Sequence, residues 1–393
     1  MINENFARLE NNYLFAEIAA RVKRFKEQNP SSGVISLGIG DVTLPLAEAV
    51  VAAMREAAAE QGRAESFRGY GPYEGYDFLR EAIAVRYERR STKIAADELF
   101  VSDGAKNDLA AILSLFKAGS RVVIPDPVYP AYLDANVLFG NEVLFVDGTE
   151  RNGFLPSPPD CAADIAYLCS PNNPTGAVYT REGLKSWVDW ANDCGAVIIF
   201  DAAYEGFVSD SELPRSIFET EGARECAIEI SSFSKSAGFT GTRCGFTVVP
   251  RELERDGKSL RALWAKRAAI MYNGCSYVIQ RGAAAALSGE GERQSAEAVE
   301  YYRANARVIA ASLAALGIES TGGVNSPYVW FKCPGGLKSW EVFDILLERA
   351  QVVCTPGAGF GKNGEGRCRF SAFGSKENTA AALERVSGVF ASL

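Results

Sequence analysis

Residues 231–245 hold the side chains whose types and spacing best suit chemistry. This stretch follows an apolar run at 226–230 that is typical of a buried strand. It places Lys235 among small and hydroxyl residues, with Arg243 further along. A lysine in such surroundings can act as a nucleophilic amine, and a nearby arginine can bind a phosphate. Taken alone, the stretch could also be a polar loop with a solvated lysine.

A carboxylate ends another apolar segment. Asp201 follows the predicted strand at 196–200, and Tyr204 comes shortly after it. A carboxylate delivered by a buried strand needs a partner, because an unpaired buried charge is costly. A protonated ring nitrogen would be such a partner. The alternative is an aspartate that caps the following turn.

Two loops place further polar groups after predicted strands. The motif Ser-Asp-Gly-Ala-Lys at 102–106 precedes a predicted helix, whose N-terminal amides can bind an anion, although it could be an ordinary capped helix. The motif Pro-Asn-Asn-Pro-Thr-Gly at 171–176 follows the strand at 165–169 and contains Asn173. Ligands of open α/β sheets bind at such strand ends.

Two later elements carry weaker signals. The sequence Gly-Ala-Gly-Phe-Gly at 357–361 is superficially like a nucleotide-binding loop, but it lacks the helix and acidic residue that should follow. Arg369 lies in a predicted strand at 367–371. An arginine can bind a carboxylate through two N–H groups, although a strand arginine more often lies on the surface.

Composition excludes several classes of function. The chain has no histidine, so no catalytic triad, Cys-His pair or metal site can depend on that residue. A general base must be a lysine, carboxylate, tyrosine or cysteine. The net charge of −8, without a basic run interleaved with aromatics, argues against nucleic acid as a partner.

Hydropathy and cysteine usage indicate a cytoplasmic location. The N-terminal residues lack an apolar core of signal-peptide length, and windows such as 196–200 and 308–316 are far too short to span a membrane. The nine cysteines include no Cys-x-x-Cys pair, and several lie in apolar runs, as reduced thiols do. We therefore expect no membrane partner, no metal and no disulfide frame.

Length and strand pattern predict an α/β fold. At 393 residues, the chain is long enough for two domains. Nearly continuous apolar segments alternate with helical patterns, which is typical of a mainly parallel sheet covered on both faces. We expect strands of this sheet at 99–101, 121–124, 142–146, 165–169, 196–200, 226–230 and 245–249.

Helical periodicity and a later change of pattern predict the domain organisation. We expect helices at 13–25, 45–61, 77–90, 105–116, 131–138, 181–194, 260–287 and 296–316. Short strands at 328–331, 352–354 and 367–371 then accompany helices at 339–350 and 376–390. We assign residues 41–290 to a large domain and 291–393 to a smaller α+β domain. The latter borrows the N-terminal arm, 1–40, with a short strand at 34–37.

Taken together, these polar groups describe a site for pyridoxal 5′-phosphate. The Lys235 amine can form a Schiff base with the cofactor aldehyde, and Asp201 can keep the ring nitrogen protonated. Asn173 and Tyr204 can hold the ring oxygen. The helix N-terminus, the serines and Arg243 can hold the phosphate. Each group follows a different strand, so a parallel sheet would bring them to one edge.

On these motifs the chain resembles the fold-type I pyridoxal-phosphate aminotransferases over essentially its full length. The resemblance implies a large domain with a mainly parallel seven-stranded sheet between helices, plus a smaller α+β domain. It also implies amino transfer between small-molecule amino acids and 2-oxo acids, in a homodimer with shared active sites. To accept a proton in that reaction, Lys235 must have a pKa well below the usual value of about 10.4.

Within that family, the resemblance is closest to the members that act on diaminopimelate. The segments that carry it are 12–15, 37–41, 70–72, 102–106, 126–130, 200–204, 232–235, 238–241 and 272–274. The implied reaction moves an amino group between LL-2,6-diaminopimelate and 2-oxoglutarate, as in lysine biosynthesis. Residues 73 and 74 depart from the pattern: many members have glutamate three positions after the tyrosine at Tyr70, and here that position is Tyr73, with Glu74 next.

The resemblance also implies roles for single residues. Lys235, Asp201 and Tyr204 are the expected catalytic groups. The expected cofactor-binding residues are Tyr70 of a second subunit, Ala105, Lys106, Tyr129, Asn173, Asp201, Tyr204, Ser232, Ser234, Lys235 and Arg243. The expected substrate-binding residues are Tyr13, Gly40, Asn173, Asn273 and Arg369, the last on the α-carboxylate.

Two other functions remain open at this point. One is an aminotransferase of the same fold that acts on lysine or another amino acid, which the departure at Tyr73 allows. The other is a non-catalytic ligand-binding protein that has kept the fold. Activity on a panel of amino acids would separate the three.

Overall fold

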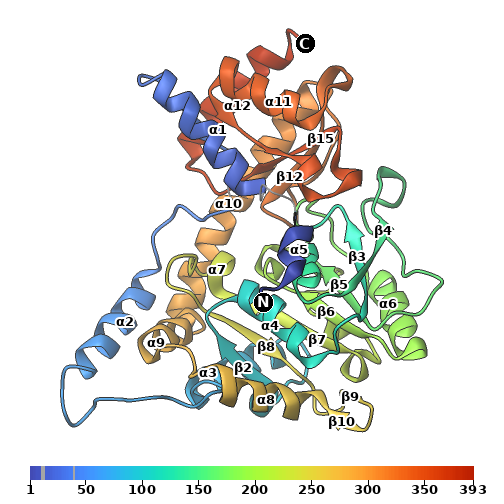
Figure 1. Cartoon of the computed structure of the whole chain (residues 1–393). Helices are drawn as coiled ribbons and strands as arrows, with labels where there is room; N and C mark the ends of the chain where they lie inside the picture. Colours follow the sequence, from blue (N-terminus) through green and yellow to red (C-terminus); the bar gives the residue numbers. More distant parts are fainter. Residues whose placement is uncertain (10–13, 39) are drawn as a thin grey trace.

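The predicted apolar strands form one sheet at the centre of the larger part of the molecule (Figure 1). The structure is a computed structural model that describes residues 1–9, 14–38 and 40–393. The seven strands lie in the order β2-β8-β7-β6-β5-β3-β4. Their bounds are β2 (Leu99–Ser102), β3 (Arg121–Asp126), β4 (Glu142–Asp147), β5 (Ile165–Cys169), β6 (Val197–Asp201), β7 (Ala227–Ser232) and β8 (Gly245–Val248).

The mainly parallel character of this sheet is confirmed. Only β8 runs antiparallel to its neighbours, β2 and β7, whereas the other paired strands are parallel. β5, β6 and β7 are buried along their whole length. Their continuous apolar sequences follow from this, because a strand covered on both faces has no solvent side.

Helices cover both faces of the sheet because successive strand residues point to opposite sides. On β5, Ile165 and Tyr167 pack in one core with α4, α5 and α8, whereas Ala166 and Leu168 pack in another with α6. A further core beside β2 and β8 involves α2, α3 and α9. These helices are α2 (Glu48–Glu60), α3 (Asp77–Glu88), α4 (Ala105–Ala111), α5 (Ala131–Leu138), α6 (Arg181–Cys194), α8 (Leu260–Met271) and α9 (Tyr277–Ala286).

A smaller four-stranded sheet forms the upper part of Figure 1, in the order β11-β12-β15-β14. The short β1 pairs in parallel with β13, which brings the N-terminal segment to this part of the molecule. The elements are α1 (Leu14–Gln28), β1 (Ile35–Ser36), β11 (Ser320–Gly322), β12 (Tyr328–Lys332), α11 (Ser339–Ile345), β13 (Val352–Val353), β14 (Thr355–Pro356), β15 (Arg367–Ser371) and α12 (Lys376–Phe390).

The long helix α10 (Gly289–Ala315) runs between the two parts in Figure 1. The remaining short elements are α7 (Phe233–Ser236), which follows β7, and the hairpin of β9 (Glu254–Arg255) and β10 (Lys258–Ser259). The pairing of β1 with β13 supports the assignment of the N-terminal arm to the smaller domain. The domain bounds 1–40, 41–290 and 291–393 stay a prediction.

The single helix expected at 260–287 is wrong, because the structure has two helices there. α8 ends before Tyr272, whose backbone is extended, and Gly274 adopts φ +85°. A β-carbon at Gly274 would lie 2.8 Å from the carbonyl oxygen of Pro72, so this turn requires glycine. The helix expected at 296–316 begins earlier, at Gly289, since Ser288 caps it by accepting from the amide of Gly291.

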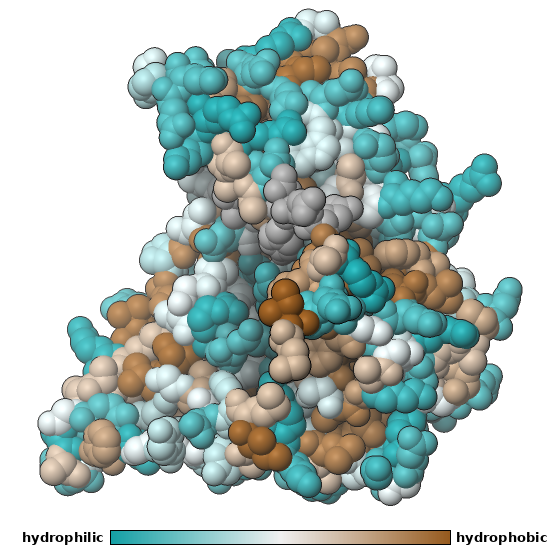
Figure 2. Space-filling model, viewed as in Figure 1, coloured by the Kyte–Doolittle hydropathy of each residue, from teal (hydrophilic) through white to brown (hydrophobic). Residues whose placement is uncertain are grey.

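Hydrophobic side chains are exposed on the lower half of the face in Figure 2, over the part that holds the large sheet. Exposed hydrophobic residues include Ile2 and Phe6 of the N-terminal segment, and Ile270 and Met271 of α8. Exposed apolar side chains gathered in this way are typical of an interaction surface. Among the helices in the described ranges, we find none with the length and hydropathy needed to cross a membrane.

Candidate active site

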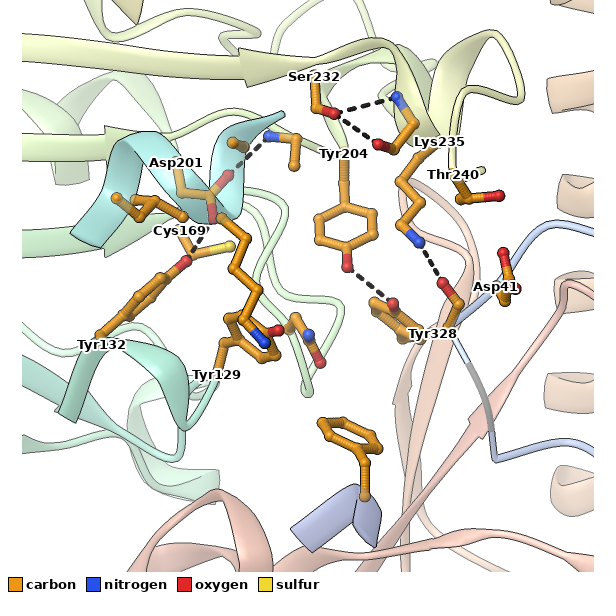
Figure 3. A pocket seen from close by; sticks show the side chains of 18 of the residues that line it. Asp41, Tyr129, Tyr132, Cys169, Asp201, Tyr204, Ser232, Lys235, Thr240 and Tyr328 are labelled. Carbon is orange, nitrogen blue, oxygen red and sulfur yellow. Dashed lines mark hydrogen bonds between the residues drawn. The ribbon is translucent and has the colours of Figure 1, made fainter. Parts of the chain in front are cut away.

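A cavity of about 350 Å³ lies where the C-terminal ends of the parallel strands meet the smaller sheet (Figure 3). Most of the side chains that the sequence selected line this one cavity. They are Gly40, Ala105, Lys106, Tyr129, Asn173, Asp201, Tyr204, Ser232, Ser234, Lys235, Arg243 and Arg369. Open α/β sheets bind ligands at this edge because their strands deliver loop residues there from several places in the sequence.

Lys235 reaches into this cavity from the short helix α7, directly after β7. Its Nζ donates a hydrogen bond to the carbonyl oxygen of Gly40. Burial lowers the pKa of Lys235 to about 8; the Asp41 carboxylate opposes this shift, and the cations Arg369 and Arg243 add to it. A lowered pKa was expected for this lysine, and burial is its main cause.

Asp201 ends β6 as a buried carboxylate. Its Oδ2 accepts a hydrogen bond from the Tyr132 hydroxyl at 2.6 Å, and its Oδ1 accepts one from the amide of Ala203 at 2.9 Å. Burial raises the pKa of Asp201, and these two hydrogen bonds oppose that shift. The carboxylate therefore lines the cavity and also caps its own turn, as the alternative interpretation expected; its pairing with a ring nitrogen stays a prediction.

One end of the cavity is a cradle of hydroxyl and guanidinium donors. Ser232 Oγ lies 2.9 Å from Ser234 Oγ, and Nη1 of Arg243 donates to Ser234 Oγ at 3.2 Å. The floor of the cradle depends on two glycines. A β-carbon at Gly104 would lie 2.1 Å from Nη2 of Arg243, and one at Gly245 would lie 3.0 Å from the Ala105 amide nitrogen.

Arg369 of β15 forms the opposite end of the cavity, and it is only 1% exposed. Nη1 donates to Oδ1 of Asn173 at 2.5 Å, and Nη2 donates to the carbonyl oxygen of Gly38 at 2.7 Å. Its guanidinium carbon lies 4.2 Å from the centre of the Tyr328 ring. The alternative of a surface arginine is therefore wrong.

Two further tyrosines line the cavity without having been selected from the sequence. Tyr132 lies in the first turn of α5, and its ring meets that of Tyr129, in the loop before the helix, edge to face at 5.8 Å. Its place at the start of the predicted helix that follows Tyr129 was the signal that could have identified it. Tyr328, on β12, lies with its hydroxyl 2.8 Å from that of Tyr204. Nothing in the local sequence around Tyr328 indicated a long-range contact with Tyr204. The other lining residues that the sequence missed are Phe15, Asp41, Leu109, Cys169, Ala203 and Thr240.

Two selected residues, Tyr70 and Asn273, are not among those that line this cavity in the single chain. A third, Tyr13, lies outside the described residues. Tyr70 is 88% exposed, in the loop before α3, and Asn273 lies in the break between α8 and α9. Tyr73, where the family pattern departs, lines a neighbouring cavity with Tyr272.

The glycine-rich segment at 357–361 has a packing role. A β-carbon at Gly357 would lie 2.0 Å from the carbonyl oxygen of Gly364, and one at Gly359 would lie 2.2 Å from Cδ1 of Leu14. Bare backbone is needed there for close approach of neighbouring segments. Close packing therefore accounts for these glycines, and no nucleotide ligand is needed to explain them.

The comparisons with known proteins agree with this geometry. Residues 32–386 match the family model described as aminotransferase class I and II. The chain is 50% identical to an LL-diaminopimelate aminotransferase of Agathobacter rectalis, with 99% of both chains covered. It is also 50% identical to one of Desulfotalea psychrophila, with 98% of both covered.

Solved structures give the same result. The fold superposes with a TM-score of 0.95 on an LL-diaminopimelate aminotransferase structure from Chlamydomonas reinhardtii, at 40% identity. That match covers 99% of this chain and 98% of the other. The predicted α/β architecture of fold type I is thereby confirmed.

Proposed function

The chain belongs to the aminotransferase class I and II family, and from that premise we propose its substrates, its cofactor and its residue roles. The proposed reaction moves an amino group between LL-2,6-diaminopimelate and 2-oxoglutarate, with tetrahydrodipicolinate and glutamate on the other side, as a step of lysine biosynthesis. The substrate assignment is supported by full-length relatives named LL-diaminopimelate aminotransferase at 47–50% identity.

The proposed cofactor is pyridoxal 5′-phosphate. The observation that carries this proposal is one cavity lined by an amine of lowered pKa, Lys235, a buried acid, Asp201, and the cradle at Arg243. The aldehyde, ring nitrogen and phosphate of this cofactor need those three groups in one site. The clash that a β-carbon at Gly104 would make with Arg243 supports a cradle shaped for close approach.

Each group of the chain has a distinct proposed role. Ser232, Ser234, Arg243 and the backbone of Ala105 and Lys106 would hold the phosphate; Tyr129 would stack on the ring; Asn173 and Tyr204 would hold the ring oxygen; and Asp201 would keep the ring nitrogen protonated. When bound, the cofactor supplies an electron-accepting ring, which stabilises the charge left as a proton leaves the substrate Cα.

Lys235 is the group that moves the proton. With a pKa of about 8, its Nζ is neutral in roughly a tenth of molecules at pH 7, far more than for an ordinary lysine, and it can take the proton from the substrate Cα. It then gives up the same proton as the product forms. Arg369 would hold the α-carboxylate with its two Nη groups, which orients the Cα–H bond toward Lys235.

A homodimer with shared sites is part of the proposal. Tyr70 is 88% exposed and would reach into the site of a second copy, while Tyr13, Gly40 and Asn273 would shape the substrate pocket. The exposed apolar side chains Phe67, Ile270 and Met271 support burial of this region against another chain. The free cysteines support a cytoplasmic location for the enzyme.

A substrate panel tests the proposed specificity. The purified protein, loaded with pyridoxal phosphate, is assayed with LL-diaminopimelate, meso-diaminopimelate and lysine against 2-oxoglutarate. We expect the largest kcat/KM for LL-diaminopimelate and parallel lines in double-reciprocal plots, since the two substrates react in separate half-reactions. A larger kcat/KM for lysine would overturn the substrate assignment. A change of Tyr73→Glu shows in the same assay whether that position affects diaminopimelate recognition.

A further inference from the structure

Tyr328 is a buried tyrosine at the junction of the two sheets. It lies on β12 of the four-stranded sheet and is 1% exposed. Its hydroxyl is 2.8 Å from that of Tyr204, which follows β6 of the large sheet, and the two rings meet edge to face at 5.1 Å. Figure 3 shows the two hydroxyls facing each other beside the Lys235 side chain. The hydrogen bond therefore joins two tyrosines that lie far apart in the sequence and come from the two different sheets.

The direction of this hydrogen bond follows from the proposed role of Tyr204. Each hydroxyl carries one proton, and either could donate to the other at 2.8 Å. If Tyr204 gives its proton to the ring oxygen of the cofactor, it can only accept from Tyr328. Arg369 lies 4.2 Å from the Tyr328 ring centre. Burial raises the pKa of both hydroxyls, so both keep their protons.

The Tyr328 hydroxyl also limits the backbone that holds the lysine. A β-carbon at Gly40 would lie 2.6 Å from Oη of Tyr328, so glycine is needed where this hydroxyl sits. The carbonyl of the same Gly40 accepts the hydrogen bond from Nζ of Lys235. Tyr328 thus touches the tyrosine, the arginine and the backbone that surround the lysine.

We propose that Tyr328 is a positioning residue for amino transfer, acting through two separate parts of its side chain. Its hydroxyl donates to Tyr204, so that the single proton of the Tyr204 hydroxyl is free to point at the ring oxygen of the cofactor. Its ring face holds the Arg369 guanidinium at the carboxylate end of the cavity. This inference rests on the proposed function, since the ring oxygen belongs to pyridoxal phosphate.

The hydroxyl is tested with Tyr328→Phe, which removes one oxygen and keeps the ring. The readout is the pH midpoint at which the absorbance of the protein-bound cofactor changes, without any substrate. When Tyr204 loses its donor, the ring oxygen is held less well as an anion and binds protons more tightly. We expect the midpoint to rise by about half to one pH unit, from the worth of one hydrogen bond.

A double-mutant cycle separates positioning from a direct effect. If Tyr328 acts through Tyr204, the variant Tyr204→Phe/Tyr328→Phe has the same midpoint as Tyr204→Phe alone. If the shifts of the two single variants add in the double variant, Tyr328 does not act through Tyr204. An unchanged midpoint in Tyr328→Phe would also overturn the proposal. The matched control is Tyr179→Phe, another buried tyrosine, whose hydroxyl donates to the Pro156 carbonyl at 3.1 Å. It loses a buried hydrogen bond of the same kind, and its midpoint stays at the wild-type value.

The ring face is tested by comparing Tyr328→Leu with Tyr328→Phe. Loss of the cation–π contact is expected to raise KM for 2-oxoglutarate by about three- to tenfold in the leucine variant relative to the phenylalanine variant. Equal KM values in the two would overturn the ring part of the proposal. If the wild-type protein binds no pyridoxal phosphate at all, the proposed function fails; if it binds the cofactor but Tyr328→Phe leaves the midpoint unchanged, only this inference fails.

Discussion

Arg369 and Asn173 are joined by a hydrogen bond of 2.5 Å, from Nη1 to Oδ1, although they come from different sheets. Arg369 lies on β15 of the four-stranded sheet, and Asn173 follows β5 of the seven-stranded sheet. The contact ties the group proposed to bind the carboxylate to a group proposed to hold the cofactor ring. In the proposed function, substrate binding and cofactor orientation would therefore share one polar network.

Replacing Arg369 tests this arrangement. Arg369→Lys keeps the charge but loses the two-pronged geometry, so we expect kcat/KM for LL-diaminopimelate to fall about ten- to hundredfold. The matched control is Arg367→Lys on the same strand, because Arg367 is also buried but pairs with Glu150 and Glu319. Its kcat/KM should stay within about twofold of wild type. Equal losses in the two variants would contradict a specific role for Arg369.

The pKa of Lys235 makes a prediction about pH. Since burial lowers it to about 8, the neutral amine fraction grows as pH rises through 8 and changes little above 9. The rate at which cofactor-free protein attaches pyridoxal phosphate should follow the same curve, measured by absorbance. Asp41→Asn removes a charge that favours the ammonium form, and it should move the midpoint to lower pH. A rate that still climbs beyond pH 10 would contradict a buried amine.

The sequence was sufficient to predict the large sheet and the cavity residues that lie at the ends of its strands, because both depend on local patterns. The strands of continuous apolar residues are recognisable without tertiary information; Asp201 ends one of them, and Lys235 lies in the short helix that follows another. Arg369 was selected as a carboxylate ligand, yet its burial depends on the long-range pairing of β15 with β12, which no local pattern encodes.

The features that the sequence did not predict depend on long-range contacts in the same way. Tyr328 is one apolar-strand residue among several, and only the meeting of the two sheets gives its hydroxyl a partner in Tyr204. The break between α8 and α9 depends on the approach of Gly274 to Pro72. A periodicity argument continues a helix through such a turn, since one glycine costs only about 1 kcal/mol in a helix.

The cradle at Gly104 predicts a loss of cofactor affinity. A β-carbon there would lie 2.1 Å from Nη2 of Arg243, with φ at +127°. Gly104→Ala must displace the guanidinium, so we expect the Kd for pyridoxal phosphate, from equilibrium dialysis, to rise at least about tenfold. Gly119→Ala is the control, because Gly119 also has a positive φ but nothing within 4 Å of its β-carbon position. A Kd change of similar size in the control would show that backbone strain alone is responsible.

The proposed sharing of sites between two chains predicts complementation between two variants of reduced activity. Tyr70→Phe and Lys235→Ala are unfolded together and refolded as a mixture. Each hybrid dimer then has one site with both residues intact, so about a quarter of wild-type activity should return in an equal mixture. Refolded separately, each variant is the control for residual activity. A mixture no more active than the sum of the two would contradict donation of Tyr70 to the second chain.

The central claim is that Lys235 holds pyridoxal phosphate and moves a proton during amino transfer from LL-diaminopimelate. The most direct measurement is a single half-reaction, in which LL-diaminopimelate alone is added to the cofactor-loaded protein and the absorbance of the bound cofactor is followed. We predict a change that goes to completion, that 2-oxoglutarate reverses with one equivalent of glutamate formed per site, and that Lys235→Ala slows by several orders of magnitude. An unchanged spectrum in the wild-type protein, or an equally fast change in Lys235→Ala, would contradict the account.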